Sequence, residues 1–373
     1  MQSLRGVPRH PATICLAVLL CAATACADRD GKEATDTTGS SPATGDEAAP
    51  VSVPSSASVA PTPSTDPAPT TTAPSSTTVA PSTTVAFSST IVTTDGEVVD
   101  ATRNRRIPYR IFAPASADGP LPVILVSHGG AGNDVGYLSG GFLGQSFASG
   151  GFIAIHIGHL VSAPGARPIE DRPADVTFVL DRLADGAIAA PGVDVDMERV
   201  GIAGHSFGAY TAHAVGGATY GTMYTDERID AIVPMSPQGP DQFEAFDRGP
   251  ADNTWMTVSI PSYNLIGGAE VDSNAVDSIV RPGWRLVPFE RYPGTADTFQ
   301  TIIAGQEHSD MWRTGSPEVQ QFEAISMLHF FQRYVAGDES VDVCSIGMAD
   351  PAFAVTQHHA GTDDSALADC PAG

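Results

Sequence analysis

Ser206 is the residue whose setting in the sequence first suggests chemistry. It lies at the centre of GHSFG, with Gly204 and Gly208 two positions away on either side. This spacing is typical of a nucleophile elbow, a tight strand-to-helix turn that exposes the serine hydroxyl. In a chain with 37 glycines the pattern alone has little weight. Its context supports it, because 199–205 predicts a strand and 206–218 predicts a helix. We therefore expect Ser206 to be a nucleophile, with both glycines allowing the sharp bend.

A serine nucleophile needs a general base, and the base needs an acid that orients it. His308 follows the predicted strand 298–305, in the loop GQEHSDMW, and is the expected base. The predicted strand 262–269 runs into an acidic segment that offers two carboxylates. We prefer Asp272 as the acid and keep Glu270, which is closer to the strand, as the main alternative. Either choice gives the chain order serine, acid, histidine.

The glycine-rich loop SHGGAGN follows the predicted strand 122–129 and provides the next candidate residues. A tetrahedral intermediate at Ser206 would carry a negative oxygen, which backbone N–H groups can stabilise. We expect these donors to be Phe207, directly after the nucleophile, and Gly130 in the loop. The loop lacks the lysine and the spacing of a phosphate-binding P-loop. His128 is expected to brace the loop and not to transfer protons.

The elements that must position these residues alternate along the chain. Near-continuous apolar strands separated by amphipathic helices predict an α/β fold with a mostly parallel central sheet and helices on both faces. Reactive groups in such sheets collect beyond the carboxyl ends of the strands, where all the candidate residues fall. The predicted strands are 107–114, 122–129, 152–159, 199–205, 229–237, 262–269 and 298–305, and the predicted helices are 175–186, 206–218 and 318–334.

The segments LPVILVSHGGAG, MERVGIAGHSFGAYTAHAVGG, SYNLIGGAEVDSNAV and AGQEHSDM give the chain a resemblance to a known family. It resembles the bacterial α/β-hydrolases related to platelet-activating-factor acetylhydrolase, also called predicted dienelactone hydrolases, and more distantly the bacterial cutinases. The resemblance covers about 105–335. It implies the α/β-hydrolase fold, with Ser206, Asp272 and His308 as the triad. True dienelactone hydrolases have a cysteine at the position of Ser206, so their activity is not implied.

Two features narrow the expected activity. Asp241 stands where polyester-cleaving cutinases carry a tryptophan, and the segment 238–260 is short and polar, so no large lid is expected. We therefore predict a serine carboxylesterase for short-acyl or small esters that needs no metal or other cofactor. The alternatives are hydrolysis of a polyester or of a short-chain phospholipid. An alternative of another class is a non-catalytic surface protein on a hydrolase scaffold.

The N-terminal part predicts a location outside the cytoplasm. A basic start and the apolar run 12–23 are typical of a signal peptide, which we place at 1–25. Cys26 follows in ATAC, which resembles a lipoprotein cleavage site and predicts lipidation, with simple secretion as the alternative. The remainder of 26–86 is rich in Ser, Thr and Pro and predicts a disordered spacer. The membrane is therefore expected to be contacted only through a lipid anchor.

The rest of the chain is predicted to be a catalytic domain, 87–336, and a tail, 337–373. Cys344 and Cys370 in the tail are expected to form a disulfide in an oxidising compartment. The formal net charge of −24 disfavours binding to nucleic acid, because like charges repel. No obligate protein partner is evident, and the expected partner is a small ester.

Overall fold

The computed structural model describes 85–130, 134–162, 164–219, 222–240, 253–271, 283–342, 346–347 and the backbone of 354–359. Every described residue lies within the unit Thr77–Gly373. The predicted signal peptide, Cys26, nearly all of the spacer, Asp241, Cys344 and Cys370 lie outside the described residues. The predictions made for them are therefore not tested.

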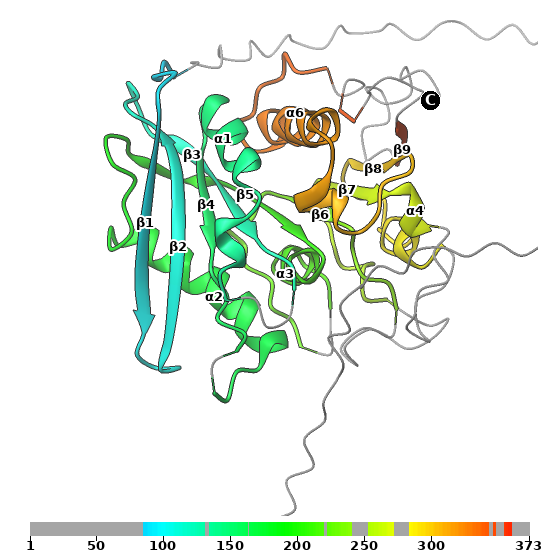
Figure 1. The fold of residues 1–373 in the computed structure, drawn as a ribbon, viewed down its shortest axis with the longest axis horizontal. Coiled ribbons are helices and arrows are strands. Elements are labelled where there is room, and N and C mark those ends of the chain that lie inside the picture. Colours follow the sequence, from blue (N-terminus) through cyan, green and yellow to red (C-terminus); the bar gives the residue numbers. More distant parts are fainter. Residues whose placement is uncertain are drawn as a thin grey trace, which may run out of the picture. The chain divides into compact units, whose positions relative to one another are not determined.

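The described part of the chain forms one nine-stranded sheet with the strand order β1-β2-β4-β3-β5-β6-β7-β8-β9 (Figure 1). The six strands from β4 to β8 in this order run parallel, and antiparallel strands close the sheet at both ends. The strands are β1 (Ile91–Asp100), β2 (Arg105–Pro114), β3 (Leu121–Ser127), β4 (Ile153–Ile157), β5 (Val195–His205), β6 (Ala231–Met235), β7 (Ser262–Gly267), β8 (Thr298–Ile303) and β9 (Ala354–His359).

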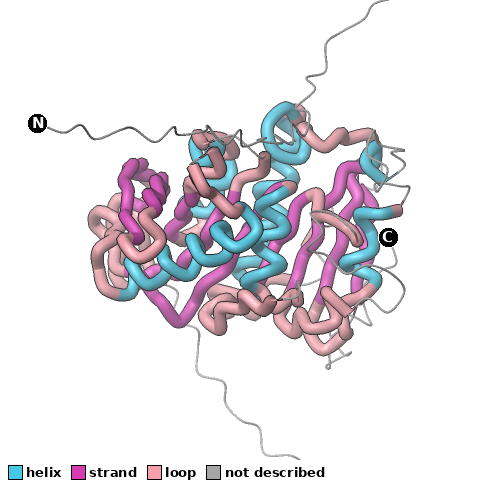
Figure 2. Tube along the Cα trace, turned by 90° about the horizontal axis from the view of Figure 1, so that it is seen from below, coloured by secondary structure: helices cyan, strands magenta, loops and turns pink. Residues whose placement is uncertain are grey.

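Helices cover both faces of this sheet, so it has no solvent-facing side in its centre (Figures 1 and 2). The helices are α1 (Gly141–Ser149), α2 (Pro168–Ala184), α3 (Phe207–Val215), α4 (Gly268–Val271), α5 (Val287–Glu290) and α6 (Pro317–Tyr334). The described residues also form the short helical turns η1 (Gly136–Leu138), η3 (Trp284–Leu286) and η4 (Asp310–Thr314).

The side chains of β3 show how the two-sided burial arises from the sequence. Alternate residues of a strand point to opposite faces. Val123 and Leu125 belong to the apolar cluster that includes residues of α2 and α3. Ile124 and Val126 belong to the other cluster, with residues of α1 and α6. A strand buried on both faces must be apolar throughout, and this is why β3 reads as a continuous apolar run.

The α/β class and the mostly parallel sheet predicted from the sequence are confirmed. The prediction missed β1, α1 and β9. The strand β1 lies at the sheet edge against β2 and is only half buried, so it offers no apolar run. The helix predicted at 175–186 begins earlier, at Pro168, where a proline suits the first turn and the acidic Glu170 and Asp171 favour a helix N-terminus.

Buried histidines make the fold sensitive to acid. His156 on β4 is fully buried, and burial lowers its pKa from 6.5 to about 4. In the unfolded chain the same ring takes up a proton near the ordinary histidine pKa of about 6.5. Between these values the unfolded state binds more protons, so this contribution to stability is complete above about pH 6.5 and falls as the pH drops towards 4.

We predict that His156→Phe weakens the loss of stability in acid. Phenylalanine keeps an aromatic ring beside Phe112, whose ring centroid lies 5.1 Å from that of His156, but it cannot bind a proton. The slope of the unfolding free energy against pH should fall by up to about 1.4 kcal/mol per pH unit between about pH 6.5 and pH 4. Urea unfolding at a series of pH values measures it. An unchanged slope would contradict this origin of the acid sensitivity.

Candidate active site

Ser206 occupies a sharp turn between β5 and α3, as the sequence predicted. Its backbone has φ 54° and ψ −116°, a conformation that non-glycine residues rarely adopt. Two close approaches accompany the turn. A Cβ on Gly204 would lie 2.1 Å from the carbonyl oxygen of Gly208, and a Cβ on Gly208 would lie 1.9 Å from that of Ser127. Neither position can hold any residue except glycine without moving backbone, so both glycines allow the strand and the helix to approach closely.

His308 lies in the loop between β8 and η4 and contacts Ser206 directly. Its Nε2 is 2.9 Å from Ser206 Oγ, and its Nδ1 is 2.5 Å from Oε1 of Glu270. In the neutral tautomer that fits both contacts, Nδ1–H donates to the carboxylate and Nε2 accepts the serine hydroxyl proton. The side chain is 42% exposed, whereas that of Glu270 is almost fully buried. A hydroxyl, an imidazole and a carboxylate are therefore connected in series, which is the arrangement that a serine nucleophile requires.

The acid in this series is Glu270, and the preference for Asp272 is corrected. Glu270 lies in α4, the short helix that begins directly after β7. The backbone N–H of Gly267, at the end of β7, donates to Glu270 Oε2 over 3.1 Å, so the carboxylate folds back against the strand end. A glutamate at this early position has the reach to contact His308. Asp272 lies outside the described residues.

Several groups besides His308 hold the Glu270 carboxylate. Ser236 Oγ donates to its Oε2 over 2.6 Å, and Arg285 Nε lies 2.8 Å from its Oε1. Burial alone would raise the pKa of Glu270. The hydrogen bond with His308 and the charge of Arg285 outweigh burial and lower this pKa to about 2. The carboxylate is therefore ionised in neutral and mildly acidic solution.

Arg285 is a component of the site that the sequence analysis missed. It lies in η3, and its Nη1 donates to the carbonyl oxygens of Ser236 and Pro237 over 2.8 and 2.9 Å. The guanidinium thus ties the acid to the segment after β6. A single arginine in a polar stretch forms no sequence pattern, so nothing in the chain marked it.

The cavity beside Ser206 has a volume of about 240 Å³. Gly129 and Gly130 line it, and Trp312 and Arg313 of η4 contribute to the lining as well. The Trp312 ring stacks on that of His205, with centroids 5.7 Å apart and planes within 13°. Aromatic surface therefore lies next to the nucleophile.

His205 forms a hydrogen bond with the backbone of His308, and its imidazole ring is neutral. Burial lowers its pKa to about 3, which leaves its Nε2–H free to donate to the carbonyl oxygen of His308 over 2.9 Å. Trp312 is itself fixed, because its Nε1–H donates to Ser139 Oγ over 2.8 Å. His205 thus contacts both Trp312, which lines the cavity, and the backbone of His308.

The glycine loop after β3 lies on the side of the cavity where the sequence placed the oxyanion donors. Gly130 has φ 84°, and a Cβ on Gly129 would lie 2.9 Å from His205 Nδ1. His128 braces the loop as expected, since its Nδ1 contacts the carbonyl oxygen of Gly129 over 2.9 Å. Phe207 is the first residue of α3, directly after the nucleophile. That Gly130 and Phe207 stabilise an oxyanion remains a prediction.

Comparison with known proteins assigns no family. No model of a known protein family matches the chain, and a search of curated proteins finds no match. Within the described ranges no helix is both long and apolar enough to cross a membrane. In the same part of the chain no three histidine, cysteine or acidic residues are grouped closely enough to hold a metal ion.

The assignment of the acid gives a paired prediction. Glu270→Gln removes the charge that orients and stabilises the protonated His308, so turnover of an accepted substrate should fall at least about 100-fold. Asp272→Asn makes the same chemical change two residues away and should leave turnover within about twofold. Steady-state kinetics of both variants decide it. The reverse ranking would restore Asp272 as the acid.

Proposed function

We propose that this chain is an extracytoplasmic serine carboxylesterase of the α/β-hydrolase fold that hydrolyses small or short-acyl esters. The observation that carries the proposal is the connected series Ser206, His308 and Glu270 beside an open cavity. The elbow geometry of Ser206 supports it, because a strained backbone at a half-buried serine that lines a cavity is typical of a functional site. The order of the strands, parallel in the centre and antiparallel at the ends, is compatible with the proposed fold.

The first half of the reaction forms an acyl-enzyme. His308 Nε2 takes the hydroxyl proton as Ser206 Oγ attacks the ester carbonyl carbon, and Glu270 stabilises the resulting imidazolium. The carbonyl oxygen becomes negative, and the N–H groups of Phe207 and Gly130 donate to it. When the tetrahedral intermediate collapses, the bond to the alcohol oxygen breaks and His308 gives its proton to that oxygen. The alcohol leaves, and the acyl group stays on Ser206.

The second half releases the acid. A water molecule gives a proton to His308 Nε2 and attacks the acyl carbonyl carbon, with the same N–H donors stabilising the oxyanion. Collapse breaks the bond to Ser206 Oγ, and His308 returns the proton to that oxygen. The products are a carboxylic acid and the free enzyme, so no metal or redox group takes part in any step.

The size of the cavity favours small acyl groups. At about 240 Å³ it lies below the range of roughly 300–1,000 Å³ that is usual for pockets of drug-sized ligands. The ring of Trp312 and the glycine loop limit the space next to Ser206. An acetyl or butyryl group is therefore favoured over a long fatty acyl chain.

The test is hydrolysis of p-nitrophenyl esters from acetyl to palmitoyl by the full chain. We expect the specificity constant kcat/KM to be highest for the shortest acyl groups and to fall steeply beyond them. Ser206→Ala should lose the activity, and Ser149→Ala, which makes the same change at the exposed end of α1, should keep it. A folded protein that hydrolyses none of these esters would contradict the proposal and favour a binding protein on a hydrolase scaffold.

A further inference from the structure

Arg172 is a fully buried arginine beside the glycine loop and the nucleophile elbow. It lies near the start of α2, and its Nη2 donates to the carbonyl oxygen of His128, directly before the loop glycines. Its Nε donates to Thr211 Oγ1 on α3 over 3.0 Å. The guanidinium carbon lies 4.7 Å from the centre of the Phe207 ring. One side chain therefore contacts both segments that carry the proposed oxyanion donors.

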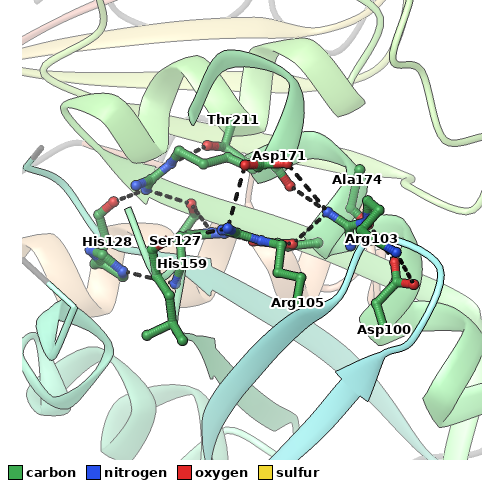
Figure 3. Close-up of polar contacts among 12 residues, drawn as sticks. Asp100, Arg103, Arg105, Ser127, His128, His159, Asp171, Ala174 and Thr211 are labelled. Carbon is green, nitrogen blue, oxygen red and sulfur yellow. Dashed lines mark hydrogen bonds and ion pairs between the residues drawn. The ribbon is translucent and has the colours of Figure 1, made fainter. Parts of the chain in front are cut away.

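Thr211 extends this contact to the backbone of the elbow. Its hydroxyl accepts from Arg172 and donates to the carbonyl oxygen of Phe207 over 3.1 Å. Figure 3 shows Thr211 and His128 in the same polar network, and Arg172 hydrogen-bonds to both residues. The first turn of α3 and the end of β3 are thus fixed relative to each other by hydrogen bonds as well as by packing.

The charge of Arg172 is unusual for so deep a position. Burial lowers the pKa of Arg172 from 12.5 to about 9, so the side chain is still charged at neutral pH. No carboxylate of the described residues forms a salt bridge with it. The charge of Asp175 offsets part of the effect of burial without a direct ion pair, and the rest is a cost that an apolar side chain at this position would avoid. The cost suggests a role beyond the stability of the fold.

A third acceptor of Arg172, Ser127 Oγ, belongs to a buried series of hydrogen-bonded side chains, here called the relay. Ser127 Oγ lies 3.3 Å from Arg172 Nη2 and 3.0 Å from His159 Nε2, and His159 Nδ1 lies 3.0 Å from Asp175. Arg105 then holds Asp175 through two hydrogen bonds of 2.7 and 2.8 Å. The contacts run from Ser127 through His159 to Asp175, just as the contacts in the candidate active site run from a serine through a histidine to a carboxylate.

This relay is not a second active site. Ser127, His159 and Asp175 are all fully buried, so no substrate can reach the hydroxyl. Burial lowers the pKa of His159 to about 4, so the ring is neutral and its Nε2 accepts the Ser127 proton while Nδ1–H donates to Asp175. The relay orients Ser127 as an acceptor for Arg172. The backbone N–H of His159 also donates to His128 Nε2 over 3.2 Å, which gives the start of the glycine loop a further hydrogen bond.

We propose that Arg172 is the positioning residue of the oxyanion hole, setting the distance between the N–H groups of Gly130 and Phe207. The proposal rests on the proposed function, because these donors matter only if Ser206 attacks a carbonyl. Arg172 touches neither the substrate nor the reacting atoms. It acts through the His128 carbonyl oxygen on one side and through Thr211 and the Phe207 ring on the other.

The geometry of the donors determines how much they contribute. Loss of one oxyanion donor typically lowers kcat about 100- to 1,000-fold, and a displacement of about 1 Å can cost a factor of about 100. Donors aimed at the transition state affect kcat more than KM, because the planar ester carbonyl uses them less. If Arg172 only stabilised the fold, replacing it would change neither kcat nor KM of the enzyme that remains folded.

The experiment compares Arg172→Met with Tyr210→Phe in the full chain. Tyr210→Phe removes a hydrogen bond of 2.9 Å between α3 and the Ile169 carbonyl oxygen of α2, so it loosens the same two helices without touching the loop. For p-nitrophenyl acetate we expect Arg172→Met to lower kcat about 100-fold with KM within about threefold. The affinity for a trifluoromethyl ketone, which forms a tetrahedral oxyanion on Ser206, should weaken by a similar factor. Tyr210→Phe should change neither.

If Arg172→Met does not fold, Arg172→Lys carries the test. Lysine keeps the charge but cannot bridge His128 and Thr211 at once, so kcat should fall by at least about tenfold while the unfolding midpoint shifts little. An unchanged kcat and unchanged affinity for the ketone in the folded variant would overturn the proposal.

Hydrogen exchange tests the positioning role of Arg172 independently of whether the protein hydrolyses esters. The His159 amide is bonded to the His128 ring and should exchange faster in the Arg172 variant than in the unaltered chain or in Tyr210→Phe. Equal exchange in all three would overturn the positioning of the loop, whether or not esters are hydrolysed. An unaltered chain that hydrolyses no ester would overturn the proposed function by itself, and with it the oxyanion role of Arg172.

Discussion

The site depends on the close approach of β3, β5 and α3 around Ser206. At Gly208 the helix comes so near to the Ser127 carbonyl oxygen that a Cβ has no room, and at Gly204 the strand comes equally near to the helix. These approaches accompany the positive φ of Ser206, whose hydroxyl lies 2.9 Å from His308 Nε2. The same packing brings the glycine loop after β3 next to the elbow. Without it, His308 would have no nucleophile within hydrogen-bond distance.

A shared carboxylate governs the electrostatics of the other half of the site. Glu270 accepts from His308, Ser236 and the Gly267 backbone and lies against Arg285. Each contact fixes the carboxylate, but the arginine charge also reduces its attraction for a protonated base. Since the pKa of Glu270 is held near 2, the acid itself does not limit activity in mild acid. Arg285 therefore helps to orient the Glu270 carboxylate, but its positive charge weakens the attraction between Glu270 and a protonated His308.

Site residues could be predicted from the sequence where they belong to a motif of neighbouring residues. The elbow glycines, the strand before Ser206 and the position of His308 after β8 could all be predicted, because each follows from neighbours in the chain. The choice between Glu270 and Asp272 could not, since it depends on the path of the backbone after β7. Arg172 lies outside the helix predicted at 175–186 and forms no recognisable pattern in the sequence. Only the packing of α2 against α3 and β3 makes it a buried cation with three acceptors.

The central claim is that Ser206 is a nucleophile activated by His308, and covalent labelling tests it most directly. A fluorophosphonate reacts with activated serines, and intact mass spectrometry with peptide mapping locates the adduct. One adduct per chain is expected, on Ser206, and it should form much more slowly when His308 is replaced by alanine because the base is lost. No adduct on a folded chain, or an adduct on another serine, would contradict the account.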